Sequence, residues 1–339
     1  MGDRQKIQVR TGGKLYLAGE YAILTPGQKA LIHFIPLYLT AEVGFSQAYE
    51  LSSDMFTHVA TMEKDTDYGL IQEAVSLMEA YLTSQGLTIR PLTLTIRGKL
   101  EKEGKKLGIG SSGSVTLLVI KALAALYAFP LSPDLLFRLG AAVLLKRGDN
   151  GSMGDLAAIA YESLVLYQSF DRKEIQHRLQ SQSLESVLAE DWGYKISPIK
   201  PRVTCDFLVG WTQKPALSSQ MVKQVQASIN PDFLVRSQST VEQLERALLV
   251  GDKPAIQQAM RSASKALENL SPLIYTEDLQ ALVAASQGLD AVAKSSGAGG
   301  GDCGIALSFA PSATEQLQKA WAAVAIQTIY QERWCSHDQ

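Results

Sequence analysis

The helix predicted over residues 115–127 places the strongest constraint on how this chain folds. Its sequence, VTLLVIKALAALY, is apolar on nearly every face, which is typical of a helix enclosed by other elements. A stretch rich in glycine and serine leads directly into it, reading KKLGIGSSGS from Lys105 to Ser114. Free backbone N–H groups and the helix dipole make such a helix start an anion site. We therefore expect a phosphate-binding loop in front of a buried central helix.

The residues of this loop are suited to a phosphate ligand. Glycine lets the backbone approach phosphate oxygens, and serine hydroxyls bind either phosphate or magnesium. Lysines at 99, 102, 105 and 106 add positive charge to the approach. The candidate ligands are Lys105, Gly108, Gly110, Ser111, Ser112, Gly113 and Ser114. The alternative interpretation is an ordinary glycine-rich turn with a serine cap.

Two familiar nucleotide motifs do not fit this loop. The glycines satisfy G-x-G-x-x-G, but charged residues from Lys99 to Lys106 stand where the dinucleotide fold requires a buried strand. The acidic residue about twenty positions on, Asp134, belongs to a helix start and not to a strand end. The chain also contains no G-x-x-x-x-G-K-[ST] motif. Both the dinucleotide fold and the Walker A loop are therefore excluded.

Three further segments combine glycines with charged residues. The first, GKLYLAGEY, begins a strand with Lys14, although a lysine there is often merely exposed. The second, RGDNGSMGD, brings Asp149 and Asp155 to a predicted helix start, where an acidic residue is commonly just a cap. The third, KSSGAGGGDCG from Lys294, leads into a predicted core strand. A tight packed loop is favoured there over a flexible linker.

The periodicity of the chain predicts two α+β units. In the first unit we predict strands at 37–43 and 92–96 and helices at 68–85, 115–127 and 134–146, with Gly86 as a helix stop and a polar amphipathic stretch at 172–192. In the second we predict strands at 205–211, 304–309 and 326–330 and helices at 235–250, 255–270, 278–286 and 313–324. Because 339 residues exceed the usual size of one core, we expect domains 1–198 and 199–339, joined near Pro198 and Pro201.

Composition argues against several other classes of protein. A net charge of −2 does not favour nucleic-acid or anionic-membrane partners, which require a basic surface. Three cysteines and four scattered histidines lack the spacing of a disulfide framework or a metal site. The N-terminus has no signal-like apolar core, and no apolar run reaches about 18 residues. We expect a cytoplasmic protein, either a monomer or a homodimer.

Taken together, these segments resemble the GHMP kinase superfamily. The order matches: a lysine strand, then G-x-G-S-S-x-S, then Ser-x-Gly-Asp, then G-x-G-G-G, over essentially the whole chain. The resemblance implies an α+β GHMP kinase fold, with an N-terminal domain like ribosomal protein S5 and a ferredoxin-like C-terminal domain. It implies an enzyme that transfers the γ-phosphate of ATP with Mg²⁺, in a site between the two domains.

The sequence is most similar to the phosphomevalonate kinase branch, in passages such as GKLYLAGEYAIL and AVAKSSGAGGGDCGIALSF. This implies (R)-5-phosphomevalonate as acceptor, with 5-diphosphomevalonate and ADP as products of the mevalonate route to isoprenoids. Many members have proline before the glycine loop, where this chain has Glu103-Gly-Lys-Lys106. The added charge suits a phosphate acceptor. Mevalonate kinase, diphosphomevalonate decarboxylase and a non-catalytic nucleotide-binding relative remain as alternatives.

The resemblance also implies roles for individual residues. Lys14 would lie near the phosphates at transfer, Lys106 would bridge donor and acceptor, and Ser112 would hold magnesium through ATP. Asp54 and Phe56 would lie near adenine. The acceptor would meet Tyr16, Glu20, Arg147, Ser152, Gly154, Ser296, Gly297, Ala298 and Gly299. Asp155 would be catalytic through its charge, because a phosphate monoester with a second pKa of about 6 needs no general base near pH 7.

Overall fold

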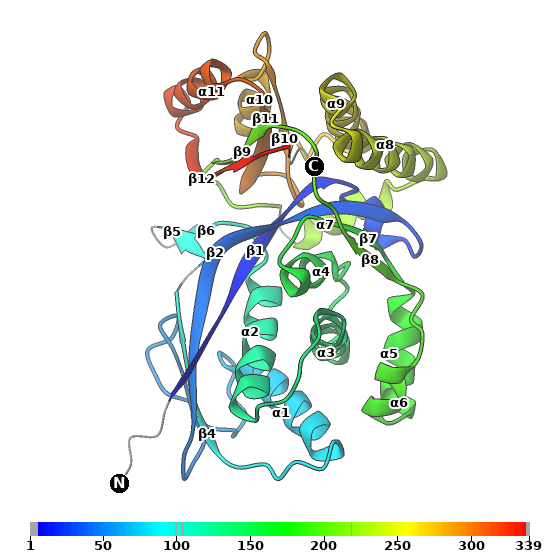
Figure 1. The fold of residues 1–339 in the computed structure, drawn as a ribbon. Helices are drawn as coiled ribbons and strands as arrows, with labels where there is room; N and C mark the ends of the chain where they lie inside the picture. Colours follow the sequence, from blue (N-terminus) through cyan, green and yellow to red (C-terminus); the bar gives the residue numbers. More distant parts are fainter. Residues whose placement is uncertain (1–5, 99, 103–104, 218, 337–339) are drawn as a thin grey trace.

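The computed structural model describes residues 6–98, 100–102, 105–217 and 219–336. The first unit is built on a six-stranded sheet in the order β3-β4-β2-β7-β8, with β1 paired to β2 (Figure 1). Its strands are β1 (Ile7–Ala18), β2 (Lys29–Phe45), β3 (Glu50–Ser53), β4 (Leu92–Arg97), β7 (Val165–Gln168) and β8 (Lys195–Pro198). The two long strands β1 and β2 reach from the far end of this unit to the second unit (Figure 1).

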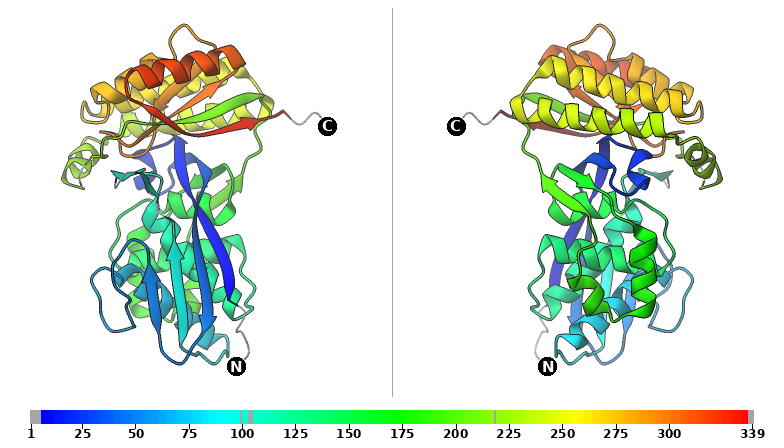
Figure 2. Two further views of the ribbon diagram at one scale, coloured as in Figure 1. Left: turned by 90° about the vertical axis from the view of Figure 1, so that its left-hand side faces the viewer. Right: turned by 90° about the vertical axis from the view of Figure 1, so that its right-hand side faces the viewer.

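Helices cover one face of this sheet (Figure 2). They are α1 (Gly69–Ser84), α2 (Ser111–Leu126), α3 (Pro133–Lys146), α4 (Gly154–Tyr161), α5 (Arg172–Ser181) and α6 (Leu184–Ala189), with a 3₁₀ turn at Ala22–Leu24. A two-stranded hairpin, β5 (Glu101–Lys102) and β6 (Lys105–Lys106), precedes α2. Eleven of the 16 residues of α2 are buried, which confirms the predicted central helix. It begins at Ser111, within the glycine-serine loop.

The second unit is ferredoxin-like. Its antiparallel sheet has the order β10-β11-β9-β12, with β9 (Cys205–Trp211), β10 (Ala291–Ser295), β11 (Cys303–Ser308) and β12 (Gln327–Trp334). Its helices are α7 (Ser219–Ala227), α8 (Pro231–Val250), α9 (Lys253–Leu270), α10 (Glu277–Ala284) and α11 (Pro311–Ala323). One strand, helices, a hairpin, a helix and a last strand give the β-α-β-β-α-β succession of that fold. Since β8 ends at Pro198 and β9 starts at Cys205, we propose domains 1–198 and 199–339.

Some predicted elements needed correction. The strand predicted at 37–43 is the second half of β2, which starts at Lys29. The polar amphipathic stretch at 172–192 forms two helices, because the Ser183 side chain caps α6 by accepting a hydrogen bond from the backbone N–H of Ser186. The Gly86 stop is confirmed, since its φ is +82° and its N–H bonds the carbonyl of Thr83. No helix among the described residues has the length and apolarity needed to cross a membrane.

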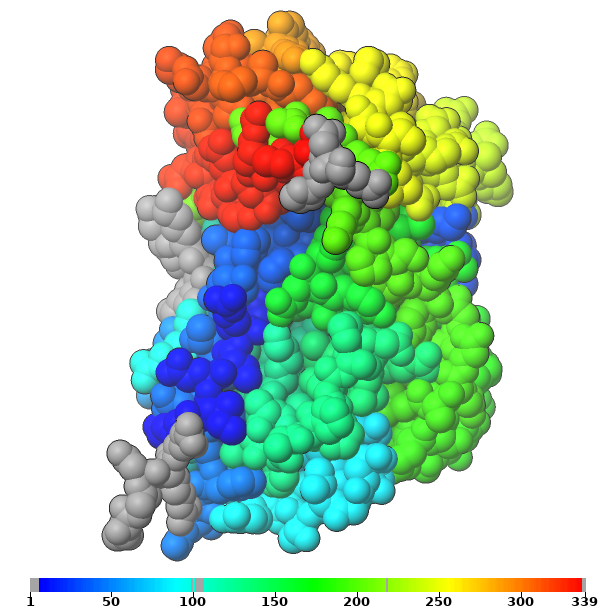
Figure 3. Space-filling view, viewed as in Figure 1, coloured from blue at the N-terminus to red at the C-terminus, as the bar shows by residue number. Residues whose placement is uncertain are grey.

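A polar contact joins the two units where β12 lies against the end of the first sheet (Figure 3). His33 of β2 is buried against Phe207 and Trp334, and its Nε2 pairs with the Glu332 carboxylate. Tyr330 and Trp334 donate further hydrogen bonds to Glu332 at 2.7 and 2.5 Å. Burial alone would raise the pKa of Glu332, but these partners hold it at about 2.

We expect Glu332→Gln to lower the free energy of unfolding at pH 7 by roughly 1–2 kcal/mol, after allowance for solvent screening. The native pKa lies below the ordinary value of 4.5, so the contribution is complete above pH 4.5 and is lost as the pH falls toward 2. Denaturant unfolding of both proteins at pH 7, 5, 4 and 3 measures this. The difference should shrink through that range, whereas Glu315→Gln on the exposed face of α11 should show no difference at any pH.

Candidate active site

Three adjoining cavities lie along one side of the first unit and under the second. We call them the apolar, central and outer cavities. The apolar cavity is lined by Phe56, Leu70, Ile71 and Ile96. It shares Ser111 and Ser112 with the central cavity. The central cavity in turn shares Lys14, Gly297 and Ala298 with the outer cavity. A ligand with an apolar head and an anionic tail could therefore reach from the first cavity toward the third.

Three elements meet at the central cavity because glycines leave room for them. The backbone N–H of Lys14 on β1 bonds the carbonyl of Ile109 at 2.8 Å, which fixes the loop against the strand. A Cβ at Gly113 would lie 2.4 Å from Oδ2 of Asp155 on α4. A Cβ at Gly110 would lie 3.1 Å from Cε of Lys14. The loop thus brings the N-terminus of α2, Lys14 and Asp155 around one space.

Gly110 also has the backbone conformation that opens α2. Its φ of +92° and ψ of 46° are left-handed, and it stands at the N-cap of the helix. The first amides of α2 have no partners within the helix, so they are free to bind an anion in the central cavity. Only a residue that tolerates the left-handed region lets the chain turn from β6 into α2 at this point.

Burial makes this site receptive to a polyanion. Desolvation lowers the pKa of Lys14, and the nearby carboxylate of Asp155 opposes that shift. Desolvation likewise raises the pKa of Asp155, and Lys14 opposes it. A partly desolvated ammonium gains more from a phosphate than a hydrated surface lysine does. Asp302, which lies within contact of the Gly108 backbone, is a second carboxylate lining this cavity.

The glycine loop that follows β10 closes the central cavity from the second unit. The Ser296 hydroxyl accepts a hydrogen bond from the N–H of Tyr16 at 2.8 Å and donates to the Tyr16 carbonyl at 3.0 Å. The Tyr21 hydroxyl donates to the carbonyl of Ala298 at 2.5 Å. A Cβ at Gly299 would lie 2.7 Å from the carbonyl oxygen of Ile274. The loop is therefore tightly packed, as predicted, and not a linker.

The wall of the outer cavity is built on Tyr16 and Ser152. The Tyr16 hydroxyl and the Ser152 Oγ lie 2.9 Å apart, and Ser152 Oγ accepts the N–H of Gly154 at 3.2 Å. The Tyr167 hydroxyl donates a hydrogen bond to the carbonyl of Ser152 at 2.9 Å. A Cβ at Gly154 would lie 2.6 Å from the Tyr16 hydroxyl, so glycine is needed for this approach. Burial raises the pKa of Tyr16, so this hydroxyl keeps its proton.

Most of the residues chosen from the sequence do converge on these cavities. Those that line or contact the central and outer cavities are Lys14, Tyr16, Gly108, Gly110, Ser111, Ser112, Gly113, Ser152, Gly154, Asp155, Ser296, Gly297, Ala298 and Gly299. Phe56 lines the apolar cavity. The side chains of Lys105 and Lys106 lie outside the described part of the structure, although their backbone forms β6.

Four chosen residues have other contacts. The Ser114 hydroxyl is fully buried and lies 2.9 Å from that of Thr11, because Ser114, in the first turn of α2, faces β1. Glu20 reaches the outer cavity, but its carboxylate pairs with Lys294. Arg147 pairs with Glu73 at 2.8 Å on the surface. Asp54 accepts the N–H of Gly98 at 2.8 Å, so it organises a turn.

Sequence reasoning missed the contributions of Asp302 and of α7. Asp302 follows the glycine loop and could have been noticed as a carboxylate beside it. The helix α7 places Ser219, Lys223 and Gln226 on the outer cavity. The helix could have been found from periodicity, because its apolar residues Met221, Val222 and Val225 have helical spacing.

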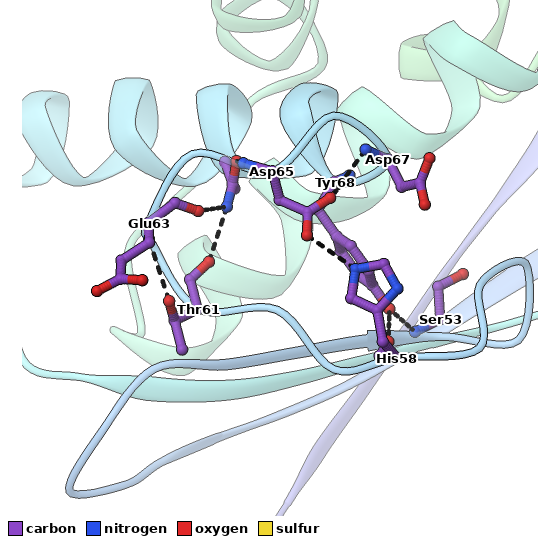
Figure 4. A network of polar contacts seen from close by, with 8 residues as sticks. Ser53, His58, Thr61, Glu63, Asp65, Asp67 and Tyr68 are labelled. Atoms are coloured by element: carbon purple, nitrogen blue, oxygen red, sulfur yellow. Dashed lines mark hydrogen bonds and ion pairs between the residues drawn. The ribbon is translucent and has the colours of Figure 1, made fainter.

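A polar network orders the segment that borders the apolar cavity (Figure 4). His58 Nε2 lies 2.8 Å from Oδ2 of Asp65, and Asp65 Oδ1 accepts the N–H groups of Asp67 and Tyr68. The Tyr68 hydroxyl donates to the carbonyl of His58 and accepts the N–H of Ser53. The atoms of His58, Asp65 and Asp67 that could bind a metal ion lie within 4.8 Å of one another. The wide spacing of the histidines in the sequence did not predict this cluster. These bonds hold Ser53 and Asp67 at the wall of the cavity.

We expect Gly110→Ala to lower kcat/KM by about 10²-fold or more, because the added Cβ would crowd Lys14 in the site where charge is placed for catalysis. This Cβ would also lie 3.6 Å from Cβ of Asp155. Strain from the left-handed φ should cost about 1 kcal/mol of stability. Steady-state kinetics and thermal unfolding measure the two effects.

The matched control for that change is Gly86→Ala. Gly86 has a comparable φ of +82°, and a Cβ there would meet nothing within 4 Å. It should show the same loss of stability with unchanged kinetics. Equal kinetics in both variants would mean that the contact between position 110 and Lys14 is irrelevant to activity.

Comparison with known proteins agrees with this geometry. Residues 69–163 match the family described as GHMP kinases N terminal domain, and residues 241–327 match GHMP kinases C terminal. A solved structure of Streptococcus pneumoniae phosphomevalonate kinase in complex with phosphomevalonate and AMPPNP is 55% identical, covering 96% of this chain and 99% of that one, with a TM-score of 0.95. The chain belongs to the GHMP kinase family.

Two more relatives of this GHMP kinase differ in what their similarity establishes about the chain. Phosphomevalonate kinase from Streptomyces sp. (strain CL190) is 28% identical over 93% of both chains. Mevalonate kinase from Methanococcus jannaschii has a TM-score of 0.74 over 99% of this chain and all of its own. At 20% identity the latter establishes the shared fold alone. This GHMP kinase is therefore an ATP-dependent kinase, as its sequence predicted.

Proposed function

We propose that this GHMP kinase transfers the γ-phosphate of ATP to the phosphate group of (R)-5-phosphomevalonate, forming 5-diphosphomevalonate and ADP. The observation that carries the proposal is the continuity of the three cavities through Ser111 and Ser112 on one side and Lys14 on the other. The 55% identical relative was solved with phosphomevalonate and AMPPNP. Adenosine would occupy the apolar cavity, the phosphates the central cavity and the acceptor the outer cavity.

The reaction needs electrostatics more than proton transfer. An oxygen of the acceptor phosphate attacks the γ-phosphorus of ATP, the bond to the β–γ bridging oxygen breaks, and ADP leaves with that electron pair. The acceptor is already mostly a dianion near pH 7, so no base has to remove a proton. What the site must supply is positive charge between two anions. Lys14 lies at the boundary of the central and outer cavities, where such a charge is needed.

The oxygen donors around the central cavity suit Mg²⁺. Ser112 and Asp155 offer a hydroxyl and a carboxylate, and hard cations of this kind prefer oxygen ligands. Magnesium bound with ATP would neutralise part of the phosphate charge. We assign Asp155 to holding that ion or orienting Lys14, and Lys106 to the bridge between donor and acceptor. We also propose a reducing, cytoplasmic location, because all three cysteines are free thiols.

A coupled assay of ADP release tests the function. Phosphomevalonate should support turnover, and mevalonate should give at most about 1% of that kcat/KM, because a neutral hydroxyl lacks the charge for which the site provides cations. Turnover with mevalonate would indicate mevalonate kinase instead. Release of CO₂ from 5-diphosphomevalonate would indicate the decarboxylase. Nucleotide binding without ADP release from any acceptor would indicate a non-catalytic relative.

A further inference from the structure

One face of α7 is directed at the outer cavity. The residues of this face are Ser219, Val222, Lys223 and Gln226, whose spacing places them on one side of a helix. The only residue that α7 buries is Val225, which lies outside this group. The cavity-facing side therefore carries three polar or charged groups, beside Val222, which packs against a buried apolar cluster.

Lys223 is an exposed lysine of α7 that lines this cavity. The described ionisable residues that line it, tyrosines aside, are Lys14, Glu20, Asp149 and Lys223. Glu20 is paired with Lys294, and Asp149 accepts the N–H of Gly151 at 2.6 Å. Lys14 also lines the central cavity. Within the described part of the chain, Lys223 has neither a hydrogen bond nor an ion pair, so its ammonium is available to a ligand.

The position of α7 places Lys223 away from the transfer centre. The N–H of Leu217, just before the helix, bonds the carbonyl of Gly299 at 3.0 Å, so α7 begins beside the glycine loop. Lys223 follows Ser219 by four residues, which is about 6 Å along a helix axis. The two lysines thus serve different parts of the outer cavity, with Lys14 at the phosphate boundary and Lys223 on the α7 wall.

We propose that Lys223 binds the carboxylate of the acceptor and so selects an acceptor that is anionic at both ends, an inference that rests on the proposed function. Phosphomevalonate has a phosphate ester at C5 and a carboxylate at C1. The phosphate must reach the boundary at Lys14 for transfer, which leaves the carboxylate in the outer cavity. Lys223 is the unpaired cation on the α7 wall, and Asp149 is an opposing charge that makes such a cation necessary. An ammonium and a carboxylate form a charge-assisted hydrogen bond.

Lys223→Met tests the inference through the division between KM and kcat. We expect the KM for phosphomevalonate to rise by about 10-fold or more, in line with the loss of one charge-assisted contact. The kcat at saturating acceptor and the KM for ATP should change by less than about 3-fold, because Lys223 touches neither the reacting atoms nor the nucleotide. Lys223→Arg should restore most of the affinity. Lys319→Met, at an exposed lysine of α11, is the control for a lost surface charge.

A second acceptor makes the test specific for the carboxylate. In an analogue of phosphomevalonate, the C1 carboxylate is replaced by a primary alcohol, and kcat/KM is measured for both acceptors with wild type and Lys223→Met. Wild type should prefer the carboxylate by about 10-fold or more, and the variant should show almost no preference. The same preference in both proteins would overturn the inference while leaving the proposed function intact. If wild type releases no ADP with phosphomevalonate, the proposed function itself fails, and the inference falls with it.

Discussion

Replacing Lys14 with Met should lower kcat on the order of 10³-fold without lowering the melting temperature. Lys14 lies where the central and outer cavities meet, so its charge is close to the phosphoryl group during transfer. Its burial, which lowers its pKa, makes the charged form costly in the folded protein. Methionine removes that cost but also removes the cation that opposes the desolvation of Asp155, so the two effects should nearly cancel in the melting temperature. Steady-state kinetics and thermal unfolding of the same preparation measure both quantities.

The control for this change is Lys6→Met, at the exposed lysine just before β1, which pairs with Glu42. Its kcat should be unchanged, and its stability should fall by no more than about 1 kcal/mol, the usual range for a surface ion pair. A Lys14→Met enzyme with wild-type kcat would remove Lys14 from the chemistry. A variant that loses activity and stability together would instead make Lys14 a structural residue.

Replacing Lys294 with Met should cost about 3–5 kcal/mol of stability, the range for breaking a buried ion pair. The side chains of Lys294 and Glu20 are 0% and 3% exposed, and the second Glu20 oxygen is buried without a hydrogen-bond partner in the described structure. Lys294 also donates to the carbonyl of Ser295 at 2.6 Å, just before the glycine loop. Removing the ammonium leaves the Glu20 carboxylate buried without its counter-charge. Denaturant unfolding at pH 7 measures the loss.

The double variant Glu20→Gln with Lys294→Met separates a charge effect from a packing effect. Its two side chains are neutral and close in volume to the originals, so it should recover most of the stability lost in Lys294→Met. If the double variant is less stable than Lys294→Met, the loss comes from packing and hydrogen bonding in the core and not from an isolated charge.

The central helix and the loop before it were predictable because two independent signals coincide there. The apolar sequence from Val115 requires enclosure, and the glycines before it require a tight approach. The structure shows the reason for each glycine in atomic terms, with Lys14 beside Gly110 and Asp155 beside Gly113. The ferredoxin-like unit came from the family resemblance, and the strand order observed in its sheet agrees with it.

The residues that sequence reasoning misplaced are those whose role depends on contacts from distant parts of the chain. Glu20 stands in a motif next to the site, but its partner is Lys294, 274 residues away. Ser114 belongs to the serine cluster, yet the helical rotation turns it toward Thr11. Lys223 gave no signal, because an exposed lysine on a helix looks in the sequence like any other surface charge. The roles of these residues depend on their partners and on the direction of their side chains in the folded protein. The local sequence pattern does not specify either.

Phosphorus NMR of the complete reaction tests the central claim most directly. With wild-type enzyme, ATP, Mg²⁺ and phosphomevalonate, the phosphate monoester signal of the acceptor should disappear. Two mutually coupled signals of a diphosphate ester should replace it in step with those of ADP, because the new bond joins two phosphorus atoms through oxygen. An acceptor signal that stays a monoester while ADP and orthophosphate accumulate would contradict the account, since ATP would then be hydrolysed and not used to phosphorylate a phosphate.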